Sequence, residues 1–284
     1  MRVVIDSNRL QSDELRAFLT ASGDNKAVLT DYAWMEAYKG NSVKSIVRSM
    51  AVLCDFPDQV VLLRGTKAVG ALDARAPGIA ERMILPRSAG QFAETVKGLR
   101  QAIEGKPKVI AQILSHGRAA EEQMAKVLAD ASQLPAILAD IAGILSPEEV
   151  RACRKGTPYQ KPMFEKVLAA TNRMCDNLFG AHPGKPRRPS RKSRVNTFLF
   201  RHSLAAVLYL LDWIREGGQL DKRRDRVRND LIDLNFATYG TYFNGVMSDD
   251  AKLRVFHEEL RIVLRLLGAR MPPDYVALFL DKLR

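Results

Sequence analysis

Cysteine is scarce in this chain, and its spacing does not favour metal binding. Cys54, Cys153 and Cys175 form no CxxC pair and have no histidine at the spacing that zinc sites use. A disulfide framework and a zinc site are therefore poor interpretations. The four histidines also occur without a partnered serine or cysteine motif, so the sequence does not support a covalent hydrolase triad.

Long apolar runs are missing as well. The first apolar stretch ends at Asp6, too short for a secretory signal, and no uncharged stretch reaches about 18 residues. We therefore expect a soluble, cytoplasmic protein with no membrane partner. The most apolar segment, about residues 196–218, contains Arg201 and His202, which favours a buried helix in which His202 is a structural histidine with its hydrogen bonds satisfied.

Acidic residues are fewer than basic ones, at 32 Asp+Glu against 44 Lys+Arg, which gives a formal net charge of +12. Such an excess favours a polyanionic partner, and nucleic acid is a better candidate than an anionic membrane. The alternative is that the charge only keeps the protein soluble.

The cations concentrate in two segments. Residues 181–194 are rich in proline and glycine, which is typical of an exposed loop, and several cations on a loop can follow a phosphate backbone without reading sequence. The second segment contains Arg224 and Arg228, directly before Asp230. A solvated linker is the alternative for the first segment, whose candidate phosphate-binding residues are Lys185, Arg187, Arg188, Arg191, Lys192 and Arg194.

Short apolar runs at both ends of the chain indicate the strands of a parallel sheet with helices between them. Thr30 or Asp31 would cap the helix after the second run. The runs are residues 3–5, 27–29, 60–63 and 245–247. From about residue 66 to 180 the apolar periodicity is helical, and no repeat of fixed period occurs. The expected class is α/β with a large, mainly α-helical insertion.

Acidic side chains follow the strands at the two ends of the chain. Asp6 follows the first strand, and Asp249 and Asp250 follow the last one. Since ligands bind at the carboxyl ends of parallel strands, neighbouring strands would bring these acids together. Taken singly, Asp249 or Asp250 is better interpreted as a helix cap.

Three further acids lie on predicted helices. Asp230 and Asp233 are three positions apart and share a helix face, where like charges cost roughly 0.2–0.5 kcal/mol. A divalent cation would reverse that cost, because Mg²⁺ and Mn²⁺ prefer carboxylate oxygens. Glu36 lies near the end of the helix after the second strand. The alternative for Asp230 and Asp233 is a solvated face balanced by nearby arginines.

These segments together resemble PIN-domain nucleases. Val3 to Asn8 resembles the family's first strand, which ends in Asp-x-Asn, and residues 27–40 resemble its second-helix segment with a glutamate. Residues 229–232 resemble its third acidic helix, and residues 245–250 resemble its strand that ends in Thr/Ser-x-Asp. The resemblance implies a PIN-like core made of residues 1–65 and 220–284. Residues 66–219, with the basic loop 181–194, would be the helical insertion.

The resemblance also implies a site and an activity. Asp6, Glu36, Asp230 and Asp250 would be the metal-binding and catalytic quartet, and Asn8 and Ser248 would support it by hydrogen bonding. Asp233 and Asp249 are extra acids that can replace their neighbours as ligands. The implied reaction is phosphodiester hydrolysis with Mg²⁺ or Mn²⁺ by an endoribonuclease, with RNA favoured over DNA.

Two other classes of function compete with this interpretation. One is a non-catalytic, basic helical module that binds nucleic acid, and the other is an interaction scaffold whose acids are only helix caps. A homodimer and an inhibitory protein partner stay open for any of the three.

Overall fold

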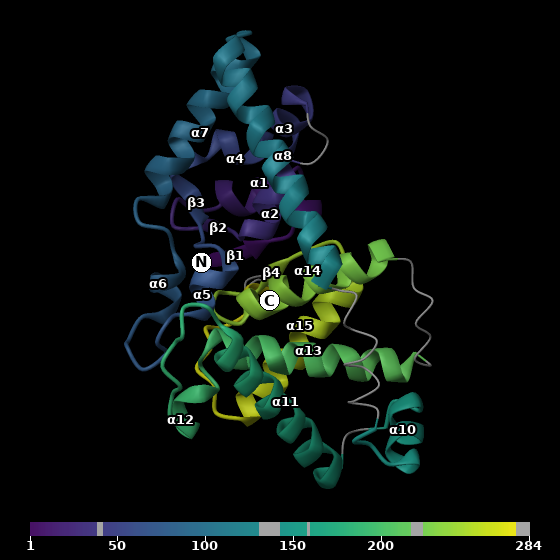
Figure 1. Cartoon of the computed structure of the whole chain (residues 1–284). Coiled ribbons are helices and arrows are strands. Elements are labelled where there is room, and N and C mark those ends of the chain that lie inside the picture. Colours follow the sequence, from purple (N-terminus) through teal and green to yellow (C-terminus); the bar gives the residue numbers. More distant parts are fainter. Residues whose placement is uncertain (39–41, 131–142, 158–159, 217–223, 277–284) are drawn as a thin grey trace.

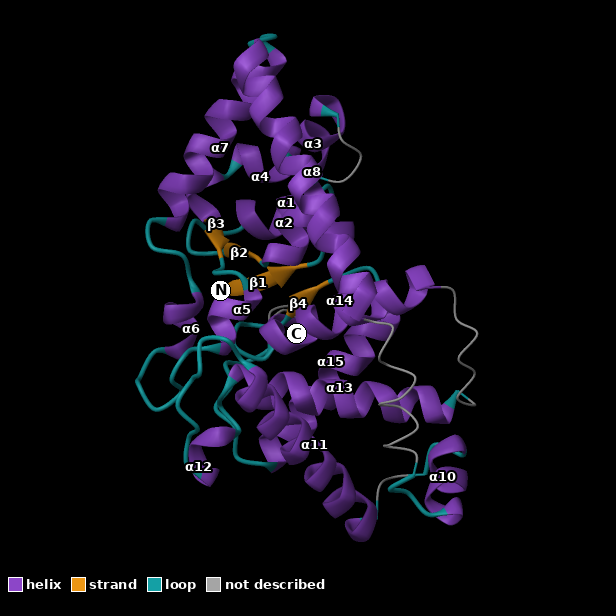
Figure 2. Ribbon diagram, in the orientation of Figure 1, coloured by secondary structure: helices purple, strands orange, loops and turns teal. Residues whose placement is uncertain are grey.

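A parallel sheet of four strands lies at the centre of the fold (Figures 1 and 2). The structure is a computed structural model, and it describes residues 1–38, 42–130, 143–157, 160–216 and 224–276. The strand order is β3-β2-β1-β4, and every neighbouring pair is parallel. The strands are β1 (Arg2–Ile5), β2 (Lys26–Leu29), β3 (Val60–Leu62) and β4 (Val246–Met247).

The direction in which the chain winds through the sheet reverses beside β1. From β1 the chain proceeds outward to β2 and then β3, and only near its C-terminus does it add β4 on the other side of β1. In register, Val4 pairs with Val28 on one side and with Val246 on the other. In open α/β sheets ligands bind at the carboxyl ends of the strands at such a switch point.

Helices flank this sheet, as a sheet with two buried faces requires. Hydroxyl caps set the start of several helices. Ser12, Thr30 and Ser42 each accept a backbone N–H of the following turn, and Ser146 forms a capping box with Glu149. The first helices are η1 (Ser7–Arg9), α1 (Asp13–Thr20), α2 (Asp31–Ala37), α3 (Val43–Ser49), α4 (Ala51–Asp55), η2 (Pro57–Gln59), α5 (Thr66–Gly70) and α6 (Ile79–Met83).

Longer helices follow, and two of them form a hairpin that projects beyond the sheet (Figure 1). These two are α7 (Ser88–Ile103), which packs on β3 and η2, and α8 (Pro107–Asp130), which packs on α7, α2, α3 and α14 (Arg224–Gly240). The remaining elements are α10 (Pro147–Arg154), α11 (Lys161–Ala181), α12 (Arg191–Arg194), α13 (Phe198–Arg215) and α15 (Ala251–Leu266).

One continuous apolar cluster joins the sheet to these helices. It includes Val4 of β1, Phe92 of α7, Leu204 of α13 and Leu260 of α15. The helix α14 packs on β1 and β4 and also contacts α8, α13 and α15. Helices from residues 66–219 thus share a core with the strands, and the division of the chain into a core and an insertion stays a prediction.

Three local features differ from the expectations. Leu63 lies outside β3 and forms an antiparallel bridge with Ile84, and part of the basic loop, Arg191–Arg194, is a helical turn. His202 is not satisfied: its Nδ1 is buried with no hydrogen-bond partner within the described ranges. The imidazole stacks on Phe198, with ring centroids 5.8 Å apart, and burial lowers the pKa of His202 to about 4, so the ring is neutral.

No helix in the part of the chain that the structure describes is long and apolar enough to cross a membrane.

Candidate carboxylate site at the switch point

The adjacent ends of β1 and β4 bring together two residues that are far apart in the sequence. Asp6 follows β1 and Ser248 follows β4, and the backbone N–H of Asp6 donates to Met247 O at 3.0 Å. The Ser248 hydroxyl then donates to Oδ2 of Asp6 at 2.5 Å. Parallel pairing of the two strands therefore fixes this contact.

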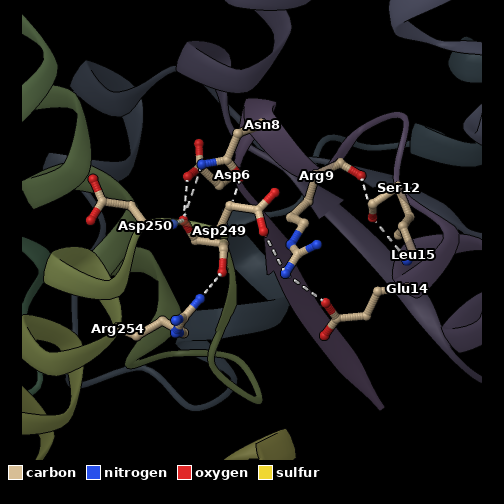
Figure 3. Close-up of polar contacts among 10 residues, drawn as sticks. Asp6, Asn8, Arg9, Ser12, Glu14, Leu15, Asp249, Asp250 and Arg254 are labelled. Carbon is tan, nitrogen blue, oxygen red and sulfur yellow. Dashed lines mark hydrogen bonds and ion pairs between the residues drawn. The ribbon is translucent and has the colours of Figure 1, made fainter.

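Ser248 connects Asp6 to Asn8 and to the residues after β4, and Figure 3 shows how Asp6, Asn8, Asp249 and Asp250 lie. Its hydroxyl oxygen accepts the backbone N–H of Asp250 at 3.0 Å and lies 3.3 Å from Nδ2 of Asn8. Asn8 in turn accepts the backbone N–H of Asp249 through Oδ1 at 3.1 Å. Asn8 and Ser248 thus hold the loop after β4 against the end of β1.

Asp6 is a buried acid, only 4% exposed. Burial raises its pKa, and hydrogen bonds from Ser248 and Ser7 oppose that rise because they stabilise the carboxylate. A carboxylate in such a position needs either a proton or a nearby cation to offset the cost of burial.

Four other acids surround Asp233 on α14. Burial is the largest cause of its raised pKa of about 8, followed by the negative charges of Asp6, Asp250, Asp230 and Glu36. Glu36 belongs to α2, and Asp230 and Asp233 belong to α14. Acids from the ends of β1 and β4 and from two helices are therefore close enough to Asp233 for their charges to raise its pKa.

Asp249 and Asp250 have different surroundings. Asp250 caps α15, because its Oδ1 accepts the backbone N–H groups of Lys252 at 2.7 Å and Leu253 at 3.2 Å. The side chain of Asp249 is 59% exposed and pairs with Arg9 at 2.8 Å. Figure 3 shows Asp249 turned toward Arg9 and Asp250 extending to the other side. Asp250 is therefore the one of the pair that faces the other acids.

Polar side chains also hold Asp230, whose carboxylate is 16% exposed. The Tyr209 hydroxyl forms a hydrogen bond with it, and this bond, after burial, contributes to the raised pKa of Tyr209. Trp213 Nε1 donates to that same hydroxyl oxygen at 2.6 Å. On the other side, Lys252 Nζ lies 4.0 Å from Asp230 Oδ1. A cation already lies at the edge of the acid cluster.

The chemistry of the cluster fits a divalent cation. Mg²⁺ and Mn²⁺ bind carboxylate oxygens, and a bound cation would relieve the repulsion that raises the pKa of Asp233. Among the described residues no three Asp, Glu, His or Cys side chains converge closely enough to form a complete ligand set. Mg²⁺ usually keeps several waters and takes one or two protein carboxylates, so an incomplete set is compatible with it.

The basic residues predicted to bind phosphate have mixed positions. Lys185, Arg187 and Lys192 are exposed. Arg188, also exposed, lies 3.9 Å from Asp176, and Arg194 is only 17% exposed because it pairs with Asp176 on α11. The side chains of Arg191, Arg224 and Arg228 lie outside the described residues.

Sequence reasoning missed the role of Asp31 at the end of β2. Thr30 is the helix cap, and Asp31 instead accepts the Thr66 backbone N–H at 2.7 Å and the Thr66 hydroxyl at 2.8 Å. The hydroxyls of Thr66 and Tyr239 are 3.0 Å apart. Burial raises the pKa of Asp31. The available signal for its position at the sheet edge, though not for its bonds to Thr66, was the one used for Asp6, an acid directly after an apolar strand.

Comparisons of the chain with models of protein families, with curated proteins and with solved structures find no match.

Proposed function

We propose that this protein is a metal-dependent nuclease of PIN type that hydrolyses phosphodiester bonds, with RNA as the favoured substrate. The observation that carries the proposal is the gathering of Asp6, Glu36, Asp230, Asp233 and Asp250 at the carboxyl edge of the sheet. The four-stranded parallel order β3-β2-β1-β4 and the +12 net charge also support it.

In this proposal the acids have different roles. Asp6, fixed by Ser248, and Asp230, fixed by Tyr209, are the anchoring ligands for one or two Mg²⁺ or Mn²⁺ ions. Glu36, Asp233 and Asp250 complete the negative pocket. When bound, the cation acts as a Lewis acid that lowers the pKa of a water and offsets the charge building on the phosphate. Asn8 acts indirectly, by fixing the loop that carries Asp249 and Asp250.

The exposed cations of residues 181–194 would bind the backbone of the substrate. Lys185, Arg187 and Lys192 are exposed and take part in no ion pair among the described residues. Contacts of this kind provide affinity that falls with salt and does not depend on sequence. Arg194 contributes to the fold through Asp176 and is not part of this proposed surface.

The test is cleavage of single-stranded RNA and DNA by wild type, Asp6→Asn and Asp13→Asn. Asp13 is an exposed acid in the first turn of α1, so its variant is a matched control. We expect cleavage with Mg²⁺ or Mn²⁺, none in EDTA, none in Asp6→Asn, and wild-type rates in Asp13→Asn. Equal cleavage by Asp6→Asn and Asp13→Asn would show that Asp6 is not needed for cleavage and would contradict the proposed site.

A non-catalytic nucleic-acid-binding module is the second candidate, favoured by the exposed cations of residues 181–194. It predicts salt-dependent retention of RNA in wild type and Asp6→Asn alike, without any product. Replacing Lys185, Arg187 and Lys192 by glutamine would weaken that retention. If retention is unchanged and no cleavage occurs, an interaction scaffold is the remaining class.

A further inference from the structure

A cavity between α7 and α8 is bordered by hydroxyl, amide and imidazole groups. Its volume is about 420 Å³, and its wall is formed by residues of both helices and by Tyr38 at the end of α2. This volume lies in the range of about 300–1,000 Å³ that is typical of small-molecule pockets. In Figure 1 the two helices run side by side away from the sheet, so the cavity belongs to the projecting hairpin.

Tyr38 is the most informative residue of this wall. It is only 3% exposed, yet its hydroxyl makes no hydrogen bond to any residue in the described ranges. The side chain is buried as a whole, but its hydroxyl oxygen is not fully enclosed by the protein, so the oxygen is open to the cavity and can bond to a ligand there. Burial raises the pKa of Tyr38 to about 12, and the hydroxyl therefore stays protonated at neutral pH.

Amide side chains face the same cavity from both helices. Gln101 of α7 and Gln112 of α8 line it, and neither amide has a side-chain hydrogen bond within the described part of the chain. An amide presents a donor and an acceptor side by side. His116 of α8 adds an aromatic ring, which meets Tyr38 edge-on with centroids 6.2 Å apart. Leu99 and Ile113 supply apolar surface beneath these groups.

The charges around the cavity compensate each other. Glu94 and Lys97, the two charged residues of its wall, pair with each other at 3.9 Å. The remaining polar groups there are hydroxyl, amide and imidazole. The matching ligand is therefore neutral, carries donors and acceptors on one edge, and has an apolar face. A nucleobase has these properties, and single-stranded bases are commonly bound in this way.

An adjoining hollow of about 360 Å³ on α7 has the opposite character. It shares Lys97 and Gln101 with the first cavity and adds Arg100 and Lys106. Lys106 pairs with Glu104 at 3.4 Å, whereas Arg100 has no ion pair among the described residues. Cations beside a neutral pocket suit the phosphate next to a bound base.

We propose that the cavity between α7 and α8 binds one nucleobase of a single-stranded nucleic acid, with the adjoining phosphate held by Arg100. The further claim that this strand is the strand being cut rests on the proposed nuclease function. Tyr38 directly follows α2, which also carries Glu36, so one short helix links the cavity to the acids. The cavity would give base preference to a site that otherwise contacts only the backbone.

The test measures binding of the four ribonucleoside 5′-monophosphates to the full-length protein in EDTA by titration calorimetry, with ribose 5-phosphate as the baseless probe. The variants are Tyr38→Phe and Gln112→Ala, with Gln123→Ala as control, because Gln123 is an exposed glutamine of α8 outside the cavity wall. Tyr38→Phe removes only an oxygen without a partner in the described chain, so the fold is retained.

We expect at least one nucleotide to bind, ribose 5-phosphate to bind more weakly, and each cavity variant to lose about 3- to 10-fold in affinity relative to Gln123→Ala, as the loss of one hydrogen bond implies. No nucleotide binding, equal binding of the baseless probe, or equal affinity of cavity and control variants would overturn the proposal. Nucleotide binding without cleavage by wild type refutes the nuclease function alone. Cleavage without nucleotide binding refutes the cavity alone.

Discussion

At the scale of single residues, Ser248 has the widest influence on the acid cluster. We expect Ser248→Ala to lower the free energy of unfolding by about 1–3 kcal/mol, because Asp6 loses a buried donor and the Asp250 N–H loses its acceptor. Affinity for Mn²⁺ should fall about 10- to 100-fold, as is usual when a residue that orients a ligand is lost. Urea denaturation and calorimetric titration measure the two effects.

The matched control is Ser12→Ala, since Ser12 caps α1 through Leu15 N at 3.1 Å but lies on another helix than the acids. Its loss should cost about 0.5–2 kcal/mol of stability and leave Mn²⁺ affinity unchanged. If both variants alter Mn²⁺ affinity equally, Ser248 acts only through overall stability.

Asp233 gives the acid cluster a pH dependence whose sign is fixed. Its pKa rises from 3.8 to about 8 on folding, so between these values the folded protein binds more protons than the unfolded chain. In EDTA the stability of wild type relative to Asp233→Asn should therefore fall as pH rises from about 4 to 8, by at most about 1.4 kcal/mol per pH unit. Urea denaturation across this range measures the difference, and saturating Mg²⁺ should flatten it. Parallel stability curves in EDTA would contradict the prediction.

Side-chain partners mark the limit of what the sequence could predict at this scale. Because acids after parallel strands share one edge, Asp6 and Asp250 could be placed together from the pattern alone. The pairing of Asp249 with Arg9 and the bonds of Asp31 to Thr66 depend on how distant segments pack, and no local pattern encodes them.

At the scale of elements, α14, β4 and α15 meet at Gly240. A Cβ there would overlap Val246 Cγ2 and lie 2.7 Å from His257 Nε2. Gly240→Ala should therefore destabilise the protein by about 1–3 kcal/mol through overpacking. The control is Gly98→Ala in α7, where no atom lies within 4 Å of the added Cβ and alanine should stabilise the helix by up to about 1 kcal/mol. Thermal unfolding followed by circular dichroism compares them, and equal melting temperatures would refute the close approach.

Element boundaries were predictable where short-range chemistry sets them. Ser12, Ser42 and Ser146 mark helix starts correctly, because a cap is a contact within one turn. The position of β4 beside β1 was not determined by its two residues. The position of β4 follows from its pairing with β1, which joins the two ends of the chain. It also depends on Gly245, whose φ of 106° is rarely adopted by residues other than glycine.

At the scale of the molecule, the acid cluster forms only when the two ends of the chain meet. Asp6 lies near the start and Asp250 near the end, and only the pairing of β1 with β4 brings them together. Closing so long a loop has an entropic cost, which the shared core of sheet and helices must offset. The sequence predicted this meeting through the acids at both ends. It could not predict how the central helices pack, because an apolar helix face does not specify which element it packs against.

Arg201 of α13 forms hydrogen bonds to several segments that are distant in the sequence. The last prediction concerns this residue. It is 1% exposed and donates to Val195 O at 3.2 Å, Thr241 O at 2.8 Å and Arg270 O at 2.7 Å. Burial lowers its pKa, and its guanidinium lies 3.9 Å from the centroid of the Tyr242 ring. Arg201→Met removes the donor from these carbonyls, and the loss of the buried bond to Thr241 O alone costs about 1–3 kcal/mol.

Arg201→Met should therefore lower the melting temperature far more than Arg215→Met. Arg215 belongs to the same helix, but its side chain is 39% exposed and its ion pair with Asp212 is partly solvated, and solvated pairs contribute about 0–1 kcal/mol. Arg201→Lys should not restore stability, because an ammonium cannot reach separate carbonyls with the fixed geometry of a guanidinium. Calorimetric melting of the three variants decides the matter. Equal melting of Arg201→Met and Arg215→Met would mean that the segments around Arg201 are held together by apolar packing alone.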